Sequence, residues 1–152
     1  MVDRTHDMAA VAKILNHPKV FGMATDDTSP DPAVPDPDAF YIIDDEESGV
    51  VRVDHVNGVC CMVHIAALPN LWGRTKDFAK EALDWGFRNT GYMKVLAMVP
   101  VFNLLAIRLC KASGFKVEGH AKKSFLKNWE LHNQILFGLT KSDFYKGDRS
   151  WQ

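Results

Sequence analysis

The sequence predicts one α/β domain of the α+β kind, with its elements in the order α(α)βββαβαββ. Three observations support this fold class. Apolar residues recur at helical spacing in several segments, and apolar or alternating runs bounded by Gly, Pro and Asn mark strands between them. The 152 residues are also enough for one hydrophobic core. We therefore expect residues 1–152 to form a single domain.

The first elements are predicted to be helical. Residues 5–16 carry apolar side chains on one helical face. His17-Pro18 ends this helix, because the residue before a proline avoids the α region. Residues 19–25 predict a second short helix. Residues 26–38 contain four prolines and five aspartates, which predicts a loop.

Three strand-like segments follow, over residues 40–44, 50–56 and 59–68. The second and third are joined by Asn57-Gly58, a strong signal for a two-residue hairpin. The third segment, VCCMVHIAAL, is almost wholly apolar. That composition predicts a strand buried on both faces.

The second half alternates helix and strand before a final hairpin. The predicted elements are a helix over 74–89, a strand over 94–99, a helix over 102–112 and two antiparallel strands over 115–126 and 129–140. Helical spacing in the second of these helices predicts that Leu105, Leu109 and Ala112 face inward.

Composition and charge exclude several classes of protein. With 47% hydrophobic and 24% charged residues, the chain is neither disordered nor a charge-driven tail. The net charge of −1 argues against a whole-molecule binder of nucleic acid. The charge is unevenly placed, however. Residues 26–47 carry −9 and residues 74–149 carry +7.

No targeting or metal-binding pattern is present in the sequence. There is no long apolar run, so no membrane segment is predicted. The three cysteines form neither a CxxC motif nor a Cys/His pair at zinc spacing, so no metal site is predicted. These features predict a cytoplasmic protein without disulfides. Trp151, close to the end, is either a packed tail residue or an anchor for a partner.

A motif in the second half resembles a known family. The stretch from Asn103 to Gly119 is similar to the N-x-x-A-x-x-L-x-x-x-x-G-F-x-x-E-G block of the Gcn5-related N-acetyltransferase (GNAT) superfamily. The resemblance implies a mixed, mostly antiparallel central sheet flanked by helices, and acetyl-CoA as cofactor. It places Asn103 near the pantetheine arm of the coenzyme. From its position alone, the Asn103 amide could equally bond to the backbone at a helix start.

The resemblance also implies where the rest of the coenzyme binds. The pantetheine would bond to the backbone of Ala66, Ala67 and Leu68. The family's pyrophosphate loop, Q/R-x-x-G-x-G/A, corresponds here to the degenerate segment Asn70-Leu71-Trp72-Gly73-Arg74-Thr75. A turn that feeds a helix N-terminus offers N–H groups to a diphosphate, and Arg74 and Lys76 add positive charge. The alternative is an ordinary helix start with solvated basic residues.

Two residues are candidates for catalysis. The family often takes a general base from the fourth strand, where His64 has a side chain that titrates near neutral pH. The alternative is a core histidine bonded to the backbone. Many members have a Tyr proton donor four residues before the position of Gly114 in the Gly-Phe pair, and Cys110 occupies that place. The alternative is a small buried helix cysteine.

Two functions follow from the resemblance. The first is an acetyl-CoA-dependent N-acetyltransferase acting on a primary amine of a small molecule or protein. The acidic segment 26–47 includes the connection between helix and strand that borders the acceptor site in this fold. Acidic loops there would attract a cationic amine, unless the Asp/Pro loop is only solvated. The alternative is a catalytically weak or inactive GNAT-like protein, similar to short degenerate ones of tailed phages, that acts by protein–protein interaction or in virion assembly. A homodimer is left open. Nucleic acid is disfavoured, because the bases are spread over several elements.

Overall fold

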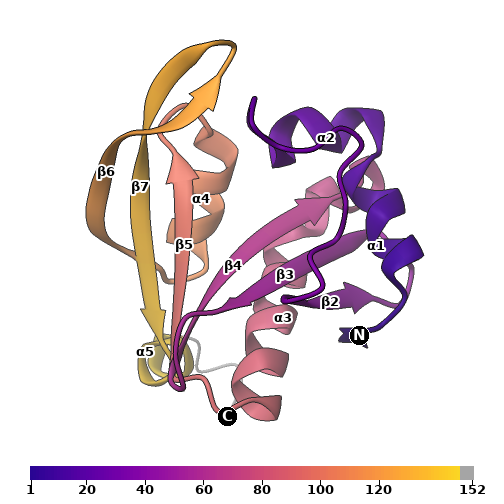
Figure 1. The fold of residues 1–152 in the computed structure, drawn as a ribbon. Coiled ribbons are helices and arrows are strands. Elements are labelled where there is room, and N and C mark those ends of the chain that lie inside the picture. Colours follow the sequence, from indigo (N-terminus) through magenta and orange to yellow (C-terminus); the bar gives the residue numbers. More distant parts are fainter. Residues whose placement is uncertain (148–152) are drawn as a thin grey trace.

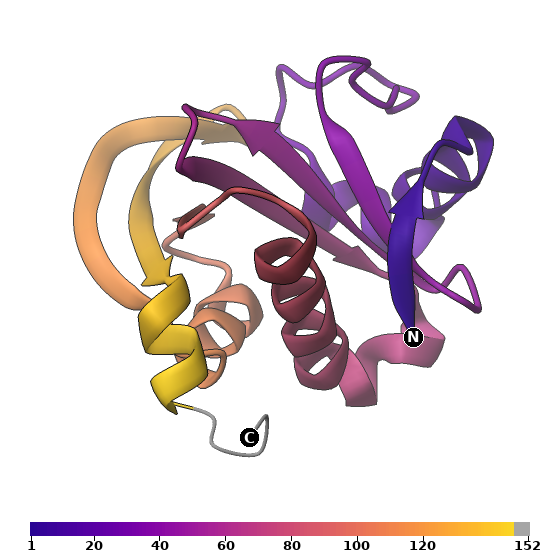
Figure 2. The same cartoon turned by 90° about the horizontal axis from the view of Figure 1, so that it is seen from below.

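The computed structural model describes residues 1–147, which form a seven-stranded sheet with helices on both faces (Figures 1 and 2). The strand order is β1-β2-β3-β4-β5-β7-β6, and only the β4–β5 pair is parallel. The elements are β1 (Val2–Thr5), α1 (Met8–Leu15), α2 (Pro18–Ala24), β2 (Phe40–Asp44), β3 (Gly49–His55), β4 (Cys60–Ala67), the 3-10 helix η1 (Pro69–Arg74), α3 (Thr75–Asn89), β5 (Lys94–Pro100), α4 (Leu104–Ala112), β6 (Lys116–Lys127), β7 (Glu130–Thr140) and α5 (Lys141–Gly147).

The predicted fold class is confirmed, and the structure adds three elements that the sequence did not predict. β1 pairs with the edge of β2, η1 follows β4, and α5 follows β7. All three are too short to show a helical or strand period. The expectation that Trp151 is a packed tail residue or an anchor for a partner concerns a residue outside the described part of the chain.

The sheet opens between its two central strands. β4 and β5 are paired only where Cys60–Met62 face Lys94–Leu96. Beyond these residues the strands diverge, while β4 remains paired with β3 and β5 with β7 (Figure 1). Consequently the facing edges of residues 63–67 and 97–100 have no strand partner across the opening. Backbone donors and acceptors on these edges are available to an extended ligand.

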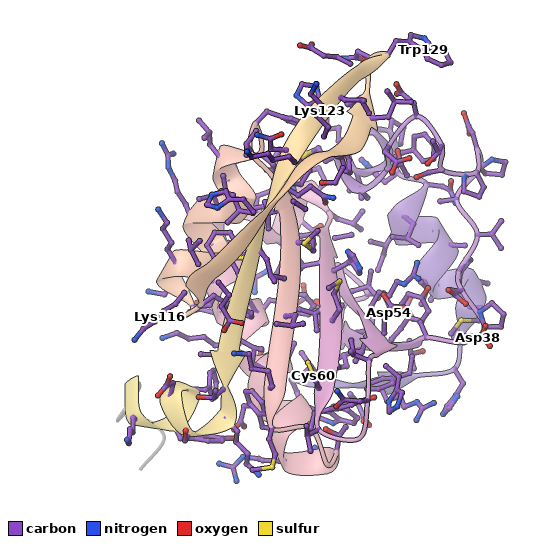
Figure 3. The ribbon with its side chains drawn as sticks, turned by 60° about the vertical axis from the view of Figure 1, so that its left-hand side comes forward. Asp38, Asp54, Cys60, Lys116, Lys123 and Trp129 are labelled. Atoms are coloured by element: carbon purple, nitrogen blue, oxygen red, sulfur yellow. The ribbon has the colours of Figure 1, made fainter. Side chains whose placement is uncertain are left out.

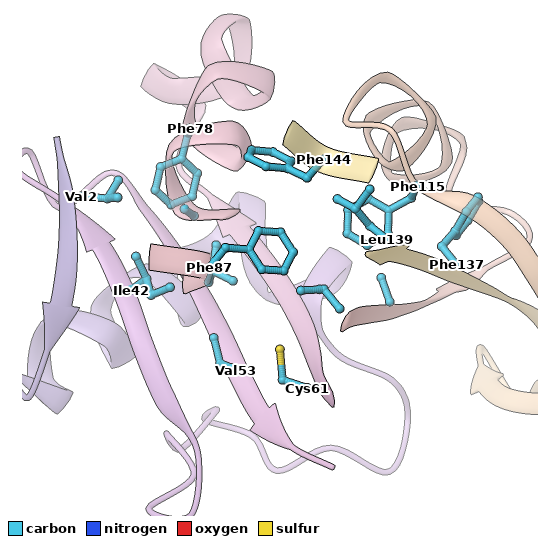
Figure 4. Close-up of a cluster of buried hydrophobic side chains, with 14 of the residues drawn as sticks. Val2, Ile42, Val53, Cys61, Phe78, Phe87, Phe115, Phe137, Leu139 and Phe144 are labelled. Carbon is cyan, nitrogen blue, oxygen red and sulfur yellow. The ribbon is translucent and has the colours of Figure 1, made fainter. Parts of the chain in front are cut away.

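Two helical layers cover the two faces of this sheet. α1, α2 and the loop over residues 25–39 lie on one face, which we call the α1–α2 face. η1, α3, α4 and α5 lie on the other, the α3–α4 face (Figure 2). Alternate residues of β3 serve the two cores, since Val50 packs with α1 and Val51 packs under α3. The larger core, under α3, contains the rings of Phe78, Phe87 and Phe144 (Figure 4).

Two predictions of burial are wrong. β4 is not buried on both faces, because it borders the opening in the sheet and leaves His64 exposed. In α4, Leu105 is 67% exposed and Ala112 is exposed as well. The helix instead turns its smaller residues, Ala106 and Cys110, together with Ile107, toward the core. Only Leu109, which is partly buried, follows the prediction. None of the described helices has both the length and the apolar character needed to cross a membrane.

Candidate active site

A cavity of about 570 Å³ lies at the opening between β4 and β5. Its walls come from both layers of the molecule. On the α1–α2 face they include residues of α2 and its following loop, and on the α3–α4 face they include inward residues of α3 and α4. The residues that the sequence singled out and that line it are His64, Ala66, Asn103 and Cys110. The opening therefore brings side chains from opposite faces of the sheet to one space.

His64 projects from β4 on the α1–α2 face, with 49% of its side-chain surface exposed. Its Nε2 atom lies 3.3 Å from Oδ2 of Asp54. Burial by the cavity walls lowers the pKa of His64. Arg52 lowers this pKa further, while Asp54 opposes both effects and raises it. The imidazole is therefore mostly neutral at neutral pH, the form that can accept a proton. It is not a core histidine bonded to the backbone.

Asp54 is held by a charge network that reaches into the long loop. Arg52 Nε donates to Asp54 Oδ1 at 3.0 Å, and Arg52 Nη2 donates to Asp36 Oδ2 at 3.0 Å. The backbone N–H of Asp36 donates to the hydroxyl of Tyr41 at 2.8 Å, which fixes this part of the loop to β2. This network was not predicted from the sequence. Its signal was the spacing of Arg52 and Asp54, two residues apart on one face of β3, in a hairpin whose register sets Arg52 opposite His64.

Asn103 caps the start of α4. Its Oδ1 atom accepts a hydrogen bond from the Ala106 N–H at 3.2 Å, so the backbone role is present. Its Nδ2 group makes no hydrogen bond with any residue in the described part of the chain. Because Asn103 also lines the cavity, that amide group can still donate to a ligand.

Cys110 lies about two helical turns beyond Asn103 on α4 and is partly buried. It lines the cavity, as a proton donor at this position would. Burial raises the pKa of the Cys110 thiol to about 11. The thiol is therefore protonated at neutral pH, but it gives up its proton less readily than an ordinary thiol.

The segment predicted to bind pyrophosphate does not line the cavity. Most of it folds as η1, and the Asn70 amide donates to the Ser48 hydroxyl at 2.7 Å. The Thr75 hydroxyl donates to the carbonyls of Leu71 and Trp72, and Lys76 lies in the first turn of α3. The space around Gly73 is open. The segment still leads into the N-terminus of α3, which has no side-chain cap and whose positive dipole end attracts an anion.

The backbone at the end of β4 is only partly available to a ligand. Ala66 is buried and lines the cavity. The carbonyl of Ala67 accepts a hydrogen bond from the Trp72 indole at 2.9 Å, and the N–H of Leu68 donates to the Ser48 carbonyl at 2.7 Å. Pairing with an extended ligand therefore rests on the part of β4 nearer to His64.

The acidic segment does not lie together beside the cavity. Of its nine carboxylates, only Asp26 is among the cavity-lining residues. The turn between β2 and β3 carries residues 44–47 to the other end of the strands. There Asp44, Asp45 and Glu46 line a separate cavity of about 170 Å³, near Arg74. The β2–β3 hairpin thus divides the acidic segment, and of its carboxylates only Asp26 lies beside the larger cavity.

The tip of the β6–β7 hairpin reaches across to α2 and the loop that follows it (Figures 1 and 3). Lys127 Nζ donates to the carbonyls of Gly22 and Thr25, at 2.7 and 2.9 Å. The Asp27 N–H donates to the Leu126 carbonyl at 2.9 Å, and the Trp129 N–H donates to Asp27 Oδ2 at 2.7 Å. These four hydrogen bonds form a bridge over the opening on the α1–α2 face, and we call them the hairpin bridge.

Comparison with known proteins relates this arrangement to a class of enzymes. No protein-family model matches the chain. One curated relative, the SPbeta prophage-derived uncharacterized N-acetyltransferase YokL of Bacillus subtilis (strain 168), is 36% identical over 75 residues. The match covers 47% of this chain and 42% of that protein. The chain therefore matches less than half the length of this relative.

Two solved structures share the fold over almost the whole chain. The first is the spermidine N-acetyltransferase SpeG of Vibrio cholerae, in complex with CoA and spermine, with a TM-score of 0.73 at 18% identity. The match covers 95% of this chain and 96% of the SpeG chain. The ribosomal-protein-S5-alanine acetyltransferase of Vibrio fischeri has a TM-score of 0.74 at 19% identity, with 94% and 93% covered. The chain thus has the fold of GNAT-type N-acetyltransferases.

Proposed function

We propose that the protein is an acetyl-CoA-dependent N-acetyltransferase that acts on a primary amine. One observation carries the proposal: a neutral histidine, supported by a carboxylate, faces an open cavity between two splayed strands. Asn103 and Cys110 approach the same cavity from the opposite face. The relative and both structural neighbours are named as acetyltransferases, which supports the same reaction.

The residues fit one part of acetyl-CoA better than the other. The unpaired strand edges and the free Nδ2 group of Asn103 suit the two amides of a pantetheine arm. The N-terminus of α3, with Lys76, suits a diphosphate. Arg74 is less available to it, since its guanidinium lies 4.0 Å from Glu46. The arm would therefore provide most of the recognition.

The reaction needs a base on one face and a thioester on the other. Acetyl-CoA supplies an activated acyl carbon, to which the amine nitrogen forms a new N–C bond while the C–S bond breaks. His64 accepts the proton that the amine nitrogen loses. The thiolate that leaves takes a proton, for which Cys110 is our candidate donor. Asp54 stabilises the imidazolium that forms on His64.

The acceptor is an amine of a small molecule or of a protein. The cavity on the α1–α2 face is lined mainly by apolar side chains, among them Met23, Ala33 and Val34, with the Asp26 carboxylate beside them. The carboxylate supports attraction of a cationic amine, although it also accepts hydrogen bonds from Thr28 and Ser29. A panel of amines, including spermidine and peptides with a free N-terminus, covers both classes.

The proposal is tested by thermal denaturation and by thiol release. Acetyl-CoA at 100 times its dissociation constant should stabilise the fold by about 2.7 kcal/mol. Incubation with acetyl-CoA and the amine panel should then release free CoA thiol faster than acetyl-CoA alone. Absence of both a thermal shift and thiol release would overturn the proposal.

A non-catalytic role is the second candidate. It is favoured by the pyrophosphate segment, which does not line the cavity, and by the prophage origin of the relative. In that case the protein would act by contact with another protein, as in virion assembly. A thermal shift with CoA but no thiol release with any amine would support this candidate over the enzyme.

Replacing Asn103 tests the pantetheine contact. We expect Asn103→Ser to keep the helix cap and the stability, because serine caps helices as well as asparagine does. The lost amide donor should weaken CoA binding by roughly 3–10-fold, the equivalent of one hydrogen bond. Asn103→Ala should weaken binding equally and also cost about 1 kcal/mol of stability. Calorimetric titration with CoA and urea unfolding measure the two effects. Unchanged affinity in both variants would contradict the contact.

Replacing Cys110 tests the proton donor. A thiol with a pKa of about 11 is a weaker acid than an ordinary thiol, so proton transfer from it to a leaving thiolate is uphill. We therefore expect Cys110→Ala to lower kcat by less than about tenfold, well short of the roughly 10²-fold or larger effect of removing an efficient acid. A loss of 10²-fold or more, with the thermal shift by CoA retained, would make Cys110 an essential donor.

A further inference from the structure

We infer that Asp54 is a positioning residue for His64, and that Arg52 and Asp36 hold Asp54 in place, so that the acceptor proton is taken by Nδ1 of His64. The inference rests on the proposed function for its catalytic meaning. Its structural content, which ring nitrogen carries the proton and what fixes the ring, can be tested without any turnover.

The β3–β4 hairpin sets the geometry. Its register places Arg52 directly opposite His64, and Asp54 two residues further along the same face of β3. Neighbours of this kind on one face lie within reach of long side chains. The Asp54 carboxylate uses both oxygens, Oδ1 toward Arg52 at 3.0 Å and Oδ2 toward His64 at 3.3 Å. It therefore cannot turn away from the imidazole without losing its arginine partner.

Asp36 extends the network from β3 to the loop on the α1–α2 face. The Asp36 carboxylate accepts a hydrogen bond from Arg52 Nη2 at 3.0 Å, while the Asp54 carboxylate accepts one from Arg52 Nε. One guanidinium thus bridges two carboxylates. Arginine suits this role because its planar group holds several N–H donors in fixed directions, whereas a lysine has a single ammonium group. With only 38% of the Arg52 side chain exposed, the network is partly shielded from solvent.

The network decides the tautomer of His64. An ionised carboxylate only accepts hydrogen bonds, so the nitrogen beside it carries the proton. That nitrogen is Nε2, which leaves the lone pair of the neutral ring on Nδ1. Nδ1 has no hydrogen-bond partner among residues 1–147. It is therefore the atom that can receive a proton from an amine in the cavity.

The charges around His64 are few. β3 contributes Arg52 and Asp54, the loop contributes Asp36 behind Arg52, and Asp26 lines the same cavity. In the described part of the chain, β5, β6 and β7 contribute only uncharged side chains to the cavity wall. The remaining titratable groups in that wall are the thiols of Cys61 and Cys110 and the phenols of Tyr41 and Tyr92.

The two charged neighbours predict opposite effects on the pKa of His64. Asp54 raises it and Arg52 lowers it. Asp54→Asn should therefore move the acidic limb of the pH profile of kcat/KM to lower pH. Arg52→Gln should move it to higher pH, because Asp54 then acts on His64 without its counter-charge. A merely structural disturbance would not shift the two profiles in opposite directions.

The first experiment is ¹⁵N NMR of the imidazole in the full chain. We expect a neutral ring protonated on Nε2 in the wild type, with a mixture of tautomers in Asp54→Asn. Titration should give a lower His64 pKa in Asp54→Asn and a higher one in Arg52→Gln. Asp38→Asn, which removes a carboxylate of the same loop that does not pair with Arg52, is the matched control and should leave the pKa unchanged (Figure 3).

The second experiment is the pH dependence of acetyl transfer by the same variants. We expect Asp54→Asn to lower kcat/KM by about tenfold or more, as loss of the group that orients a functional histidine does. A proton on Nδ1 in the wild type, or parallel pKa shifts in the two variants, would overturn the inference even if the enzyme is active. Absence of turnover with any amine, together with the expected NMR result, would instead overturn the proposed function alone.

Discussion

His64→Ala is expected to lower kcat/KM for acetyl transfer by roughly 10²–10⁴-fold, the usual contribution of a general base. The reason is the position of the imidazole, neutral and half-exposed at the cavity, with a carboxylate on its Nε2 side. The substitution removes no core packing, so the thermal shift caused by acetyl-CoA should be retained. Steady-state thiol release, measured with the same amine, gives the comparison.

The pH profile sharpens this expectation. Because burial lowers the pKa of His64, the neutral form persists below the ordinary value of about 6.5. Activity of the wild type should therefore remain high at pH 6.5 and fall as the pH drops through the lowered pKa. His64→Ala should lack this acidic limb. A residual activity that keeps the same limb would show that another group is the base.

His55→Ala is the matched control. His55 lies on the neighbouring strand of the same hairpin, and its Nδ1 atom is 2.7 Å from the hydroxyl of Tyr92. It does not line the cavity. We expect its removal to leave kcat/KM within about threefold of the wild type, as for a residue outside the reacting geometry. An equal loss in both variants would mean that the hairpin, and not the imidazole of His64, is being tested.

Phe87→Ala is expected to lower the free energy of unfolding by about 3–5 kcal/mol. Phe87 is 1% exposed on α3. Its ring centroid lies 5.5 Å from that of Phe144 on α5 (Figure 4). The distance to the ring centroid of Tyr145, on the same helix, is 6.2 Å. Truncation removes the ring and leaves a void between α3, α5 and the sheet. Since a domain has only about 5–15 kcal/mol of net stability, much of it would be lost.

Urea unfolding measures this loss against two controls. Phe87→Leu keeps a large apolar side chain in the same place and should cost clearly less than alanine. Val34→Ala truncates a side chain that is 69% exposed and should stay within about 0.5 kcal/mol of the wild type. A cost below about 1 kcal/mol for Phe87→Ala would mean that α5 does not pack on α3 as described.

The arrangement of strands and helices could be predicted from the sequence because its local signals agree with one another. Asn57-Gly58 predicts the β3–β4 hairpin, and Pro100 and Gly114 lie at the ends of β5 and α4. β1 could not be predicted from its four residues, which carry only one buried apolar side chain. The rotation of α4 also escaped prediction, since Leu105 and Ala106 are equally compatible with a helical core face until the neighbouring elements are placed.

The candidate site was predictable residue by residue but not as a network. His64, Asn103 and Cys110 come from separate elements, and all three line the cavity. In the sequence, nothing distinguishes Arg52, Asp54 and Asp36 from ordinary charged surface residues. Only the strand register and the path of the loop bring them to His64. In the segment predicted to bind pyrophosphate, by contrast, the sequence pattern predicted a role that the structure does not place at the cavity. Its spacing suggested a ligand loop, whereas hydrogen bonds to Ser48 and within η1 decide its conformation.

The short segment over which β4 and β5 are paired affects how the chain folds. β1 to β4 pair mostly with strands close to them in sequence, and β5, β6 and β7 form a second group. Within the sheet, three residue pairs connect the two groups. These pairs are parallel, so the crossover through α3 must be in place before they can form. Contacts between distant segments form late. We therefore expect the two groups to fold as separate units, and the amides of Cys61 and Leu96 to gain protection from hydrogen exchange last.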